Sequence, residues 1–250
     1  MQVFMHPDLE LSANALIDAS LGVRYELTTD AAWLAKELRR EPCVEDLVPV
    51  FARHQGVNEA DAQRALYQFM GLLDVYGGIR ITWDQPLRLF DHFKMSMVWR
   101  TRYQGTWSGF VRSVTRAYWL WLVCLTLMLG CMQMFAKGEL ASVWLMMPAI
   151  ALMTCVIHEA GHAAAAKIAG VPFVFLARSA GLAILYRTPE GWRARFIAGC
   201  GPALAVVFCG ACWATNNVAA LRFVCTIAAG LHAASLLPFL ADGKTIWRKL

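Results

Sequence analysis

The sequence predicts an α-helical multi-pass membrane protein, with about four transmembrane helices and a membrane-associated β-hairpin, preceded by a small α+β domain. Hydrophobic residues make up 58% of the 250 residues and charged residues only 16%, whereas soluble globular proteins carry about 25% charged residues. The charge is also unevenly distributed, with a net −6 over residues 1–85 and a net +11 over residues 86–250. An acidic, polar module is therefore joined to a basic, apolar one.

Residues 1–85 are the predicted α+β domain, with the order strand, three helices, strand. Residues 21–28 alternate apolar and polar side chains and are rich in strand-forming types. Thr29 or Asp30 is placed to cap the first helix, and Asn58 to cap the third. The helices are expected within 31–40, 44–53 and 58–76, and the closing strand within 78–83.

The N-terminus lacks the charged start and apolar run that are typical of a signal peptide. We therefore expect the first domain to stay in the cytoplasm. Residues 86–116 mix aromatic side chains with arginines, a composition typical of a segment that lies in the membrane interface. This stretch is expected to be an interfacial linker, or alternatively an ordinary connector.

Residues 117–250 are the predicted transmembrane domain. A membrane-spanning helix needs about 20 mostly apolar residues, and four stretches meet this requirement. Between the second and the third, two short β-rich runs flank Ser179, Ala180 and Gly181 and predict a hairpin. At membrane depth such a hairpin must be buried in protein or line a watery cavity. The four stretches are at about 117–136, 141–169, 196–215 and 219–241.

The positions of lysine and arginine predict the orientation in the membrane. Basic residues are frequent before the first stretch, between the second and the third, and after the fourth, whereas the opposite loops hold only Lys137 and Arg222. We therefore expect a multi-pass protein of the cytoplasmic membrane with both termini in the cytoplasm.

The second apolar stretch contains an HExxH sequence, in which His158 and His162 flank Glu159. Residues four apart share a helix face, so both imidazoles can bind one ion. Zinc suits two neutral imidazoles and leaves room for a third ligand and a water. Zinc lowers the pKa of its water, and Glu159 is the expected general base that passes the proton to the leaving amine. Each ionisable residue in an apolar span costs about 2.5–3.5 kcal/mol, which favours a functional site.

Asp242 is the expected third ligand, because it ends the fourth apolar stretch, which runs in the same direction as the second. Pro238 lacks a backbone donor and is expected to kink this helix. Two alternatives remain open: Asp242 as an ordinary residue at a cytoplasmic helix end, and Glu190 as the oxygen ligand. His232 is interpreted as an interior histidine, with a role in the site as the alternative.

These residues resemble the site-2 protease family of intramembrane zinc metalloproteases. His158, Glu159 and His162 match the HExxH of that family. Leu236-Leu237-Pro238 with Asp242-Gly243 resembles its LLP…DG motif, whose aspartate is the third zinc ligand. The resemblance covers about residues 117–250, and it implies a zinc metalloendopeptidase.

Two further features resemble that family. Gly201-Pro202 is similar to the Gly-Pro that opens its intervening span. The predicted hairpin, at about 172–187, lies where the family has a β element that presents substrate as an added strand. The resemblance therefore implies a substrate-binding role for Ser179, Ala180 and Gly181.

The sequence departs from the family pattern at three places. Ser235 stands where the family usually has an asparagine, and Ala205 lies near the position of a second one. The stretch from Pro238 to Asp242 is one residue shorter than usual. The two side-chain amides would help to stabilise an oxyanion or hold the substrate strand in that family.

Residues 1–85 resemble a PqqD-type domain, a recognition element of systems that modify ribosomally made peptides. The matching residues are a strand with Tyr25-Glu26-Leu27-Thr28 and helices that end in Phe69-Met70-Gly71-Leu72-Leu73. Such domains bind a leader peptide by pairing it with an edge strand, which implies a substrate-binding role for Tyr25 and Leu27. A generic winged-helix domain is the alternative.

Together these observations predict a membrane zinc protease that processes a precursor peptide bound by its N-terminal domain. One alternative is a regulatory protease that cleaves a membrane-anchored signalling protein, and another is an inactive homologue that escorts or exports a peptide. The expected partners are a peptide or membrane-protein substrate and membrane lipid, and no nucleic acid. The sequence leaves the oligomeric state open.

Overall fold

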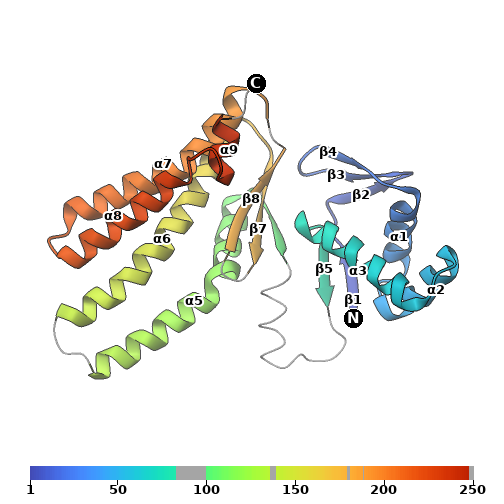
Figure 1. The fold of residues 1–250 in the computed structure, drawn as a ribbon, viewed down its shortest axis with the longest axis horizontal. Helices are drawn as coiled ribbons and strands as arrows, with labels where there is room; N and C mark the ends of the chain where they lie inside the picture. The colour runs from blue at the N-terminus through green and yellow to red at the C-terminus, as the bar shows by residue number, and fades with distance from the viewer. Residues whose placement is uncertain (83–99, 136–138, 179–180, 188, 248–250) are drawn as a thin grey trace. The chain divides into compact units, whose positions relative to one another are not determined.

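A computed structural model describes residues 1–82, 100–135, 139–178, 181–187 and 189–247 of the chain (Figure 1). The chain divides into two compact units, which are described separately. Unit 1 comprises Met1–Arg116 with Val174–Gly181, and unit 2 comprises Ala117–Phe173 with Leu182–Leu250.

Unit 1 contains two small antiparallel sheets formed by its first five strands. In one sheet β1 pairs with β5, and in the other the strand order is β2-β3-β4. The predicted strand at 21–28 is confirmed as β4, and the closing strand as β5. The three strands before β4 were not predicted. The bounds are β1 Gln2–Met5, β2 Leu9–Ser12, β3 Ala15–Asp18, β4 Val23–Glu26 and β5 Ile79–Thr82.

The three predicted helices of unit 1 are confirmed. Asn58 caps the third, because its side chain accepts a hydrogen bond from the Asp61 N–H. The cap of the first is Thr28, which accepts from the Ala31 N–H, and not Thr29 or Asp30 as expected. Gly77 follows the third helix with φ 61°, a left-handed conformation that favours glycine. The bounds are α1 Thr29–Arg40, α2 Val44–Gln55 and α3 Glu59–Val75.

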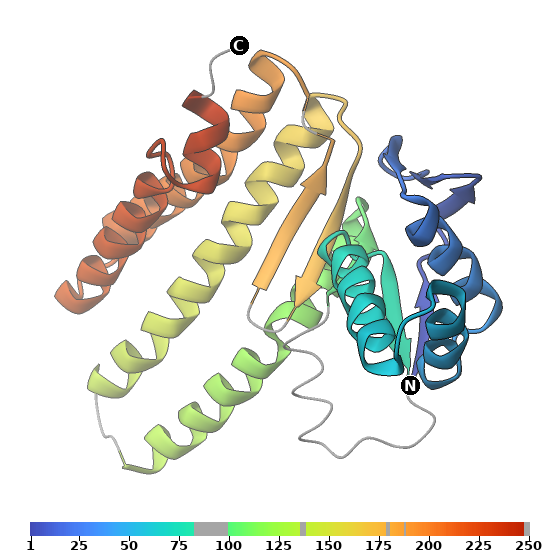
Figure 2. The same ribbon diagram turned by 45° about the vertical axis from the view of Figure 1, so that its right-hand side comes forward.

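The core of unit 1 lies between these helices and the strands (Figure 2). Its side chains come from the buried positions of β1, β2, β3, β5 and all three helices. Leu38, Leu47, Leu66 and Met70 are among the largest fully buried side chains. Fully burying such a side chain contributes about 1.5–3 kcal/mol, so this core stabilises the small domain.

The predicted linker 86–116 lies partly outside the described residues. The described part forms β6 (Thr101–Gln104) and the start of α5 (Trp107–Phe135), so its last ten residues are helical. β6 belongs to a sheet of order β6-β7-β8, whose other members are β7 (Phe173–Arg178) and β8 (Gly181–Tyr186). The two predicted β-rich runs are therefore neighbouring strands.

A buried ion pair connects β3 with β6 inside unit 1. The Arg102 guanidinium donates from Nη1 to Asp18 Oδ2 at 2.7 Å and from Nη2 to Asp18 Oδ1 at 2.6 Å, and both side chains are fully buried. Nearby, the Arg100 N–H donates to Asp74 Oδ1 at 2.8 Å. β6 is thus held to the first 82 residues by polar contacts with two buried carboxylates.

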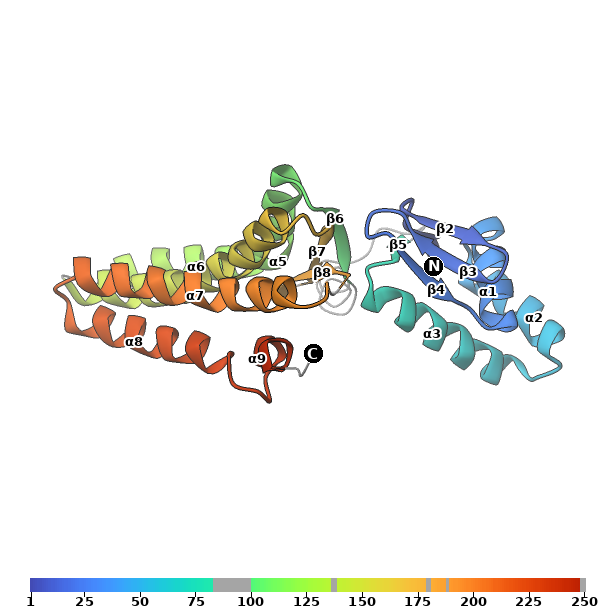
Figure 3. The same ribbon diagram turned by 90° about the horizontal axis from the view of Figure 1, so that it is seen from above.

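Unit 2 is built from long helices. α6, α7 and α8 pack side by side, and the short α9 packs against α7 (Figure 3). Two segments, Met146–Ile168 of α6 and Trp192–Thr215, are long and apolar enough to cross a membrane, and α8 is apolar but has only 16 residues. The bounds are α6 Glu139–Ile168, α7 Trp192–Thr215, α8 Ala219–Ala234 and α9 Ala241–Trp247.

Two expectations about these helices are wrong. The fourth apolar stretch is not one helix to residue 241, because α8 ends at Ala234 and turns lead to α9. Pro238 lies within these turns, and its missing N–H and fixed φ favour such a break. Gly201-Pro202 does not open a helix, because α7 begins at Trp192, about two and a half turns earlier.

Candidate metal centre

The candidate metal centre is a cluster of His158, His162 and Asp242. The two histidines lie on one face of α6. His158 and His162 are four residues apart, and their Nε2 atoms lie 3.0 Å from each other. The His162 side chain is buried, with 8% of the residue exposed, and His158 is half-buried. The i, i+4 spacing thus brings two nitrogen donors to one point, as the sequence predicted.

Asp242 brings a carboxylate to the same point from the first turn of α9. Its Oδ2 lies 3.4 Å from His158 Nε2, and its Oδ1 lies 3.5 Å from His162 Nε2. The Gly243 N–H donates to the Ser235 carbonyl at 3.0 Å, which closes the turn onto the end of α8. A Cβ at Gly243 would collide with the Leu237 carbonyl, so this close approach requires glycine.

The His162 ring is fixed by α7. Its Nδ1 lies 2.6 Å from the Ile197 carbonyl, which can only accept, so Nδ1 carries a proton and donates. In the neutral ring Nε2 then carries a lone pair directed at the cluster. A Cβ at Gly201 would meet the His162 ring, and a Cβ at Gly161 would lie 2.7 Å from the Cys200 carbonyl. The two glycines therefore allow α6 and α7 to approach closely.

His158 has a different partner. Its Nδ1 lies 3.0 Å from Nδ1 of His232 on α8, and the two ring centroids are 4.9 Å apart. The sequence had placed His232 in the fourth apolar stretch and interpreted it as an interior histidine. No spacing rule connects two residues 74 positions apart, so the contact itself could not be predicted.

The donor set fits a zinc ion. In a tetrahedral site with bonds of about 2.0–2.2 Å, ligand atoms lie about 3.3–3.6 Å from each other. The two separations between an imidazole Nε2 and an Asp242 oxygen, 3.4 and 3.5 Å, lie in this range, and the 3.0 Å between the two Nε2 atoms is slightly shorter. Among the residues that the structure describes, these three side chains are the one group of histidine, cysteine and acidic residues suited to hold a metal ion.

Glu159 follows His158 on α6 and is half-buried. Its carboxylate interacts electrostatically with His158 and Asp242, and also with Tyr118 and Tyr186. A carboxylate that reaches a water held at the cluster can take its proton and give it to a leaving group.

The other predicted site residues that the structure describes are not members of this cluster. Tyr25 is in β4 and Leu27 directly follows it, both in unit 1. Gly181 is the first residue of β8, whereas Ser179 and Ala180 lie outside the described residues. Glu190 precedes α7 and is not part of the cluster.

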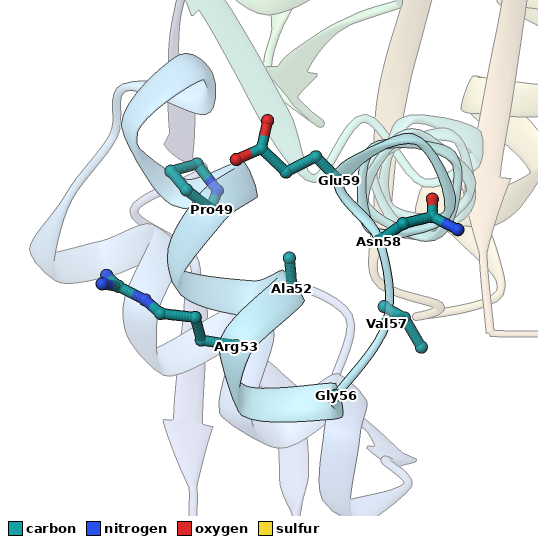
Figure 4. A pocket seen from close by; sticks show the side chains of 7 residues that line it. All are labelled: Pro49, Ala52, Arg53, Gly56, Val57, Asn58 and Glu59. Carbon is teal, nitrogen blue, oxygen red and sulfur yellow. The ribbon is translucent and has the colours of Figure 1, made fainter.

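A hollow in unit 1 lies at the turn between α2 and α3 (Figure 4). Arg53 extends from α2 and Glu59 from α3 at its rim. The residues that line it include no histidine or cysteine, so it offers none of the chemistry of the cluster. They are Pro49, Ala52, Arg53, Gly56, Val57, Asn58 and Glu59.

No protein-family model, curated protein or solved structure matches the chain. The resemblance to site-2 proteases therefore rests on the motif residues themselves.

Proposed function

We propose that the protein is an intramembrane zinc metalloprotease that processes a ribosomally made precursor peptide. The observation that carries this proposal is the convergence of His158, His162 and Asp242, whose donor atoms lie 3.0 to 3.5 Å apart. The separations of 3.4 and 3.5 Å suit tetrahedral zinc, and Glu159, which follows His158 in the sequence, has the chemistry of a general base. The same four residues match the motifs of the site-2 protease family.

The membrane setting is supported by the helix that carries the motif. His158, Glu159 and His162 lie in the segment Met146–Ile168, which is long and apolar enough to span a bilayer. Ionisable groups at such a depth are costly, which favours a function for them. We propose a multi-pass protein of the cytoplasmic membrane, with four spanning segments and both termini in the cytoplasm.

The chemistry is peptide-bond hydrolysis. Zinc held by the three ligands would activate a water as the nucleophile. Glu159 takes the proton of that water on its carboxylate and passes it to the amine of the leaving peptide. Ile197 keeps the His162 ring oriented, because its carbonyl accepts the hydrogen bond of the Nδ1 atom that faces away from the cluster.

Recognition of the substrate is proposed to use the edge of β4. In the sheet β2-β3-β4 this strand is the last, so within the described chain its outer side pairs with no other strand. The Tyr25 ring lies against Tyr76, with centroids 5.0 Å apart, and Leu72 and Val75 of α3 are exposed on the same unit. An edge strand with an aromatic contact next to it suits an extended peptide.

The reaction is tested by comparing membranes that contain the wild type with membranes that contain Glu159→Gln, using peptide mass spectrometry in cells that make the natural partners. A short peptide product found only with the wild type would support the proposal and identify the substrate. Zinc content is the control, because Glu159 is not a ligand and its replacement should leave zinc bound. Equal peptide profiles with zinc retained in both proteins would contradict hydrolysis by this site.

The same experiment separates the main alternative. A fragment of a membrane-anchored regulator, released only by the wild type, would favour a regulatory protease over peptide maturation.

A further inference from the structure

We propose that His232 is a positioning residue for the zinc ligand His158, and that its Nδ1 accepts a hydrogen bond from the Nδ1–H of that ligand. This inference rests on the proposed metal centre. The two Nδ1 atoms are 3.0 Å apart, the distance of an N–H hydrogen bond, and the ring planes differ by 31°. The contact joins α6 to α8.

The need for such a partner follows from the chemistry of a histidine ligand. A neutral imidazole that binds a metal through Nε2 carries its proton on Nδ1, and this N–H must find an acceptor. His162 has the Ile197 carbonyl at 2.6 Å, but the Nδ1 of His158 faces a second imidazole. His232 can accept only with its own proton on Nε2, so the pair is fixed in one tautomer.

The position of His232 is itself connected to the third ligand. The Ser235 hydroxyl donates to the His232 carbonyl at 2.7 Å, and the Ser235 carbonyl accepts from the Gly243 N–H at 3.0 Å. The end of α8 therefore holds both the ring that contacts His158 and the turn that presents Asp242. The end of α8 therefore contributes to the orientation of His158 and Asp242, while α7 orients His162.

A merely interior histidine would give different results on substitution. His232→Phe keeps an aromatic ring but removes the acceptor, whereas His232→Asn places its side-chain oxygen near the position of Nδ1 and keeps an acceptor. His232→Leu is a second variant without an acceptor, for use if the phenylalanine does not fold. Leu231, the next residue along α8, is 69% exposed, so Leu231→Ala is the matched control.

The test measures metal binding by the full-length protein purified in detergent. Zinc affinity is obtained by competition with a chromophoric chelator, and the ligand geometry from the visible absorption spectrum of the cobalt(II)-substituted protein. We expect His232→Phe to weaken zinc binding about 10- to 100-fold, the usual effect of losing a partner of a metal ligand, and to change the cobalt spectrum. His232→Asn should stay within about threefold of the wild type, and Leu231→Ala should be unchanged.

Wild-type affinity and spectrum in folded His232→Phe or His232→Leu would overturn the positioning role alone. An asparagine variant as weak as the phenylalanine variant would overturn the acceptor role. A wild-type protein that binds no zinc would overturn the metal centre and this inference together, so the two failures are distinguishable.

Discussion

Asp18 in unit 1 and Asp242 in unit 2 show two ways in which this chain holds a carboxylate away from water. Asp18 makes two short hydrogen bonds with Arg102, at 2.6 and 2.7 Å, and both side chains are fully buried. Asp242 instead faces two imidazole nitrogens at 3.4 and 3.5 Å, distances too long for strong hydrogen bonds. Asp18 has a permanent cation as its partner. The Asp242 carboxylate instead lies next to two imidazole nitrogens, which are atoms of the kind that bind metal ions.

The difference separates a structural charge from one that belongs to the proposed metal centre. Arg102 is always protonated and its planar group matches a carboxylate, so the pair in unit 1 is complete without any ligand. Histidines can offer lone pairs, and together with an aspartate they form a set that suits zinc. Four predictions test this difference between unit 1 and unit 2, in order of decreasing expected effect.

The largest effect is expected when the cation of unit 1 is removed. Arg102→Leu leaves Asp18 buried without its partner, which should destabilise unit 1 by about 3–5 kcal/mol. Hydrogen exchange of the β3 amides in the full-length protein measures the loss. Arg24→Leu is the control, because its ion pair with Glu26 is exposed and worth at most about 1 kcal/mol. If the β3 amides are equally protected from exchange in both variants, the buried Arg102–Asp18 pair is not what holds β6.

The cluster of unit 2 can be disturbed without changing any donor. Gly201→Ala places a methyl group against the His162 ring, so we expect about 10- to 100-fold weaker zinc binding. Gly210→Ala on the same helix meets no atom within 4 Å and should bind zinc normally. Chelator competition measures both variants. Unchanged zinc affinity in folded Gly201→Ala would mean that the His162 ring is not fixed as described.

The third prediction tests whether unit 1 binds the peptide that unit 2 is proposed to cut. The Leu27 N–H donates to the Asn14 carbonyl at 2.8 Å, so by alternation the Glu26 N–H points to the outer edge of β4. Glu26→Pro removes that donor and should weaken precursor-peptide binding about two- to tenfold, the effect of one hydrogen bond of about 0.5–1.5 kcal/mol. Fluorescence anisotropy of the labelled peptide identified as substrate measures this.

Glu26→Ala is the matched control, because it removes the same side chain and keeps the N–H. If the proline and alanine variants bind the peptide equally well, the edge of β4 is not the recognition surface. Zinc content should be unchanged in both, since Glu26 belongs to unit 1.

The smallest expected effect is the change of the stability of unit 1 with pH, and this prediction compares the contributions of two of its aspartates. Burial alone raises the pKa of Asp18, but hydrogen bonds from Arg102 and Ser20 outweigh it and lower the pKa. Its stabilisation is therefore present above the unfolded pKa of about 3.9 and is lost as pH falls through the folded value. Burial raises the pKa of Asp74 despite the Arg100 N–H, so its contribution is present at low pH and is lost as pH rises.

Asparagine variants test these opposite signs. Asp18→Asn should lower the stability of unit 1 at pH 7 and remove part of the loss on acidification. Asp74→Asn keeps an acceptor for Arg100 and should leave the stability at pH 7 unchanged or slightly higher. Hydrogen exchange of β3 and α3 between about pH 2 and 7 gives both, and changes of the same sign in the two variants would contradict the assignment.

The sequence predicted those features of the fold and the site that depend on residues close to each other along the chain. The helices of unit 1 follow from their periodicity and caps, and His158 meets His162 because a helix places residues four apart on one face. Asp242 was identified by its motif, yet its place on α9 was not, because the break after Ala234 depends on how the turns pack.

Contacts between distant residues that belong to no recognised motif could not be predicted. Arg102 pairs with Asp18 across 84 positions, and His232 meets His158 across 74. Gly201 was noted only as part of a Gly-Pro pair, and the ring that lies against it belongs to another helix. Such pairs are fixed by tertiary packing, which leaves no periodic signal in one sequence.

The most direct test of the central claim is the zinc content of the purified full-length protein and two ligand variants. We predict about one zinc per chain in the wild type, and loss of most of it in His158→Ala and in Asp242→Ala, because each removes one of three protein ligands. Leu231→Ala should retain the metal. Full zinc retention in both ligand variants, or a wild type that takes up no zinc, would contradict the metal centre.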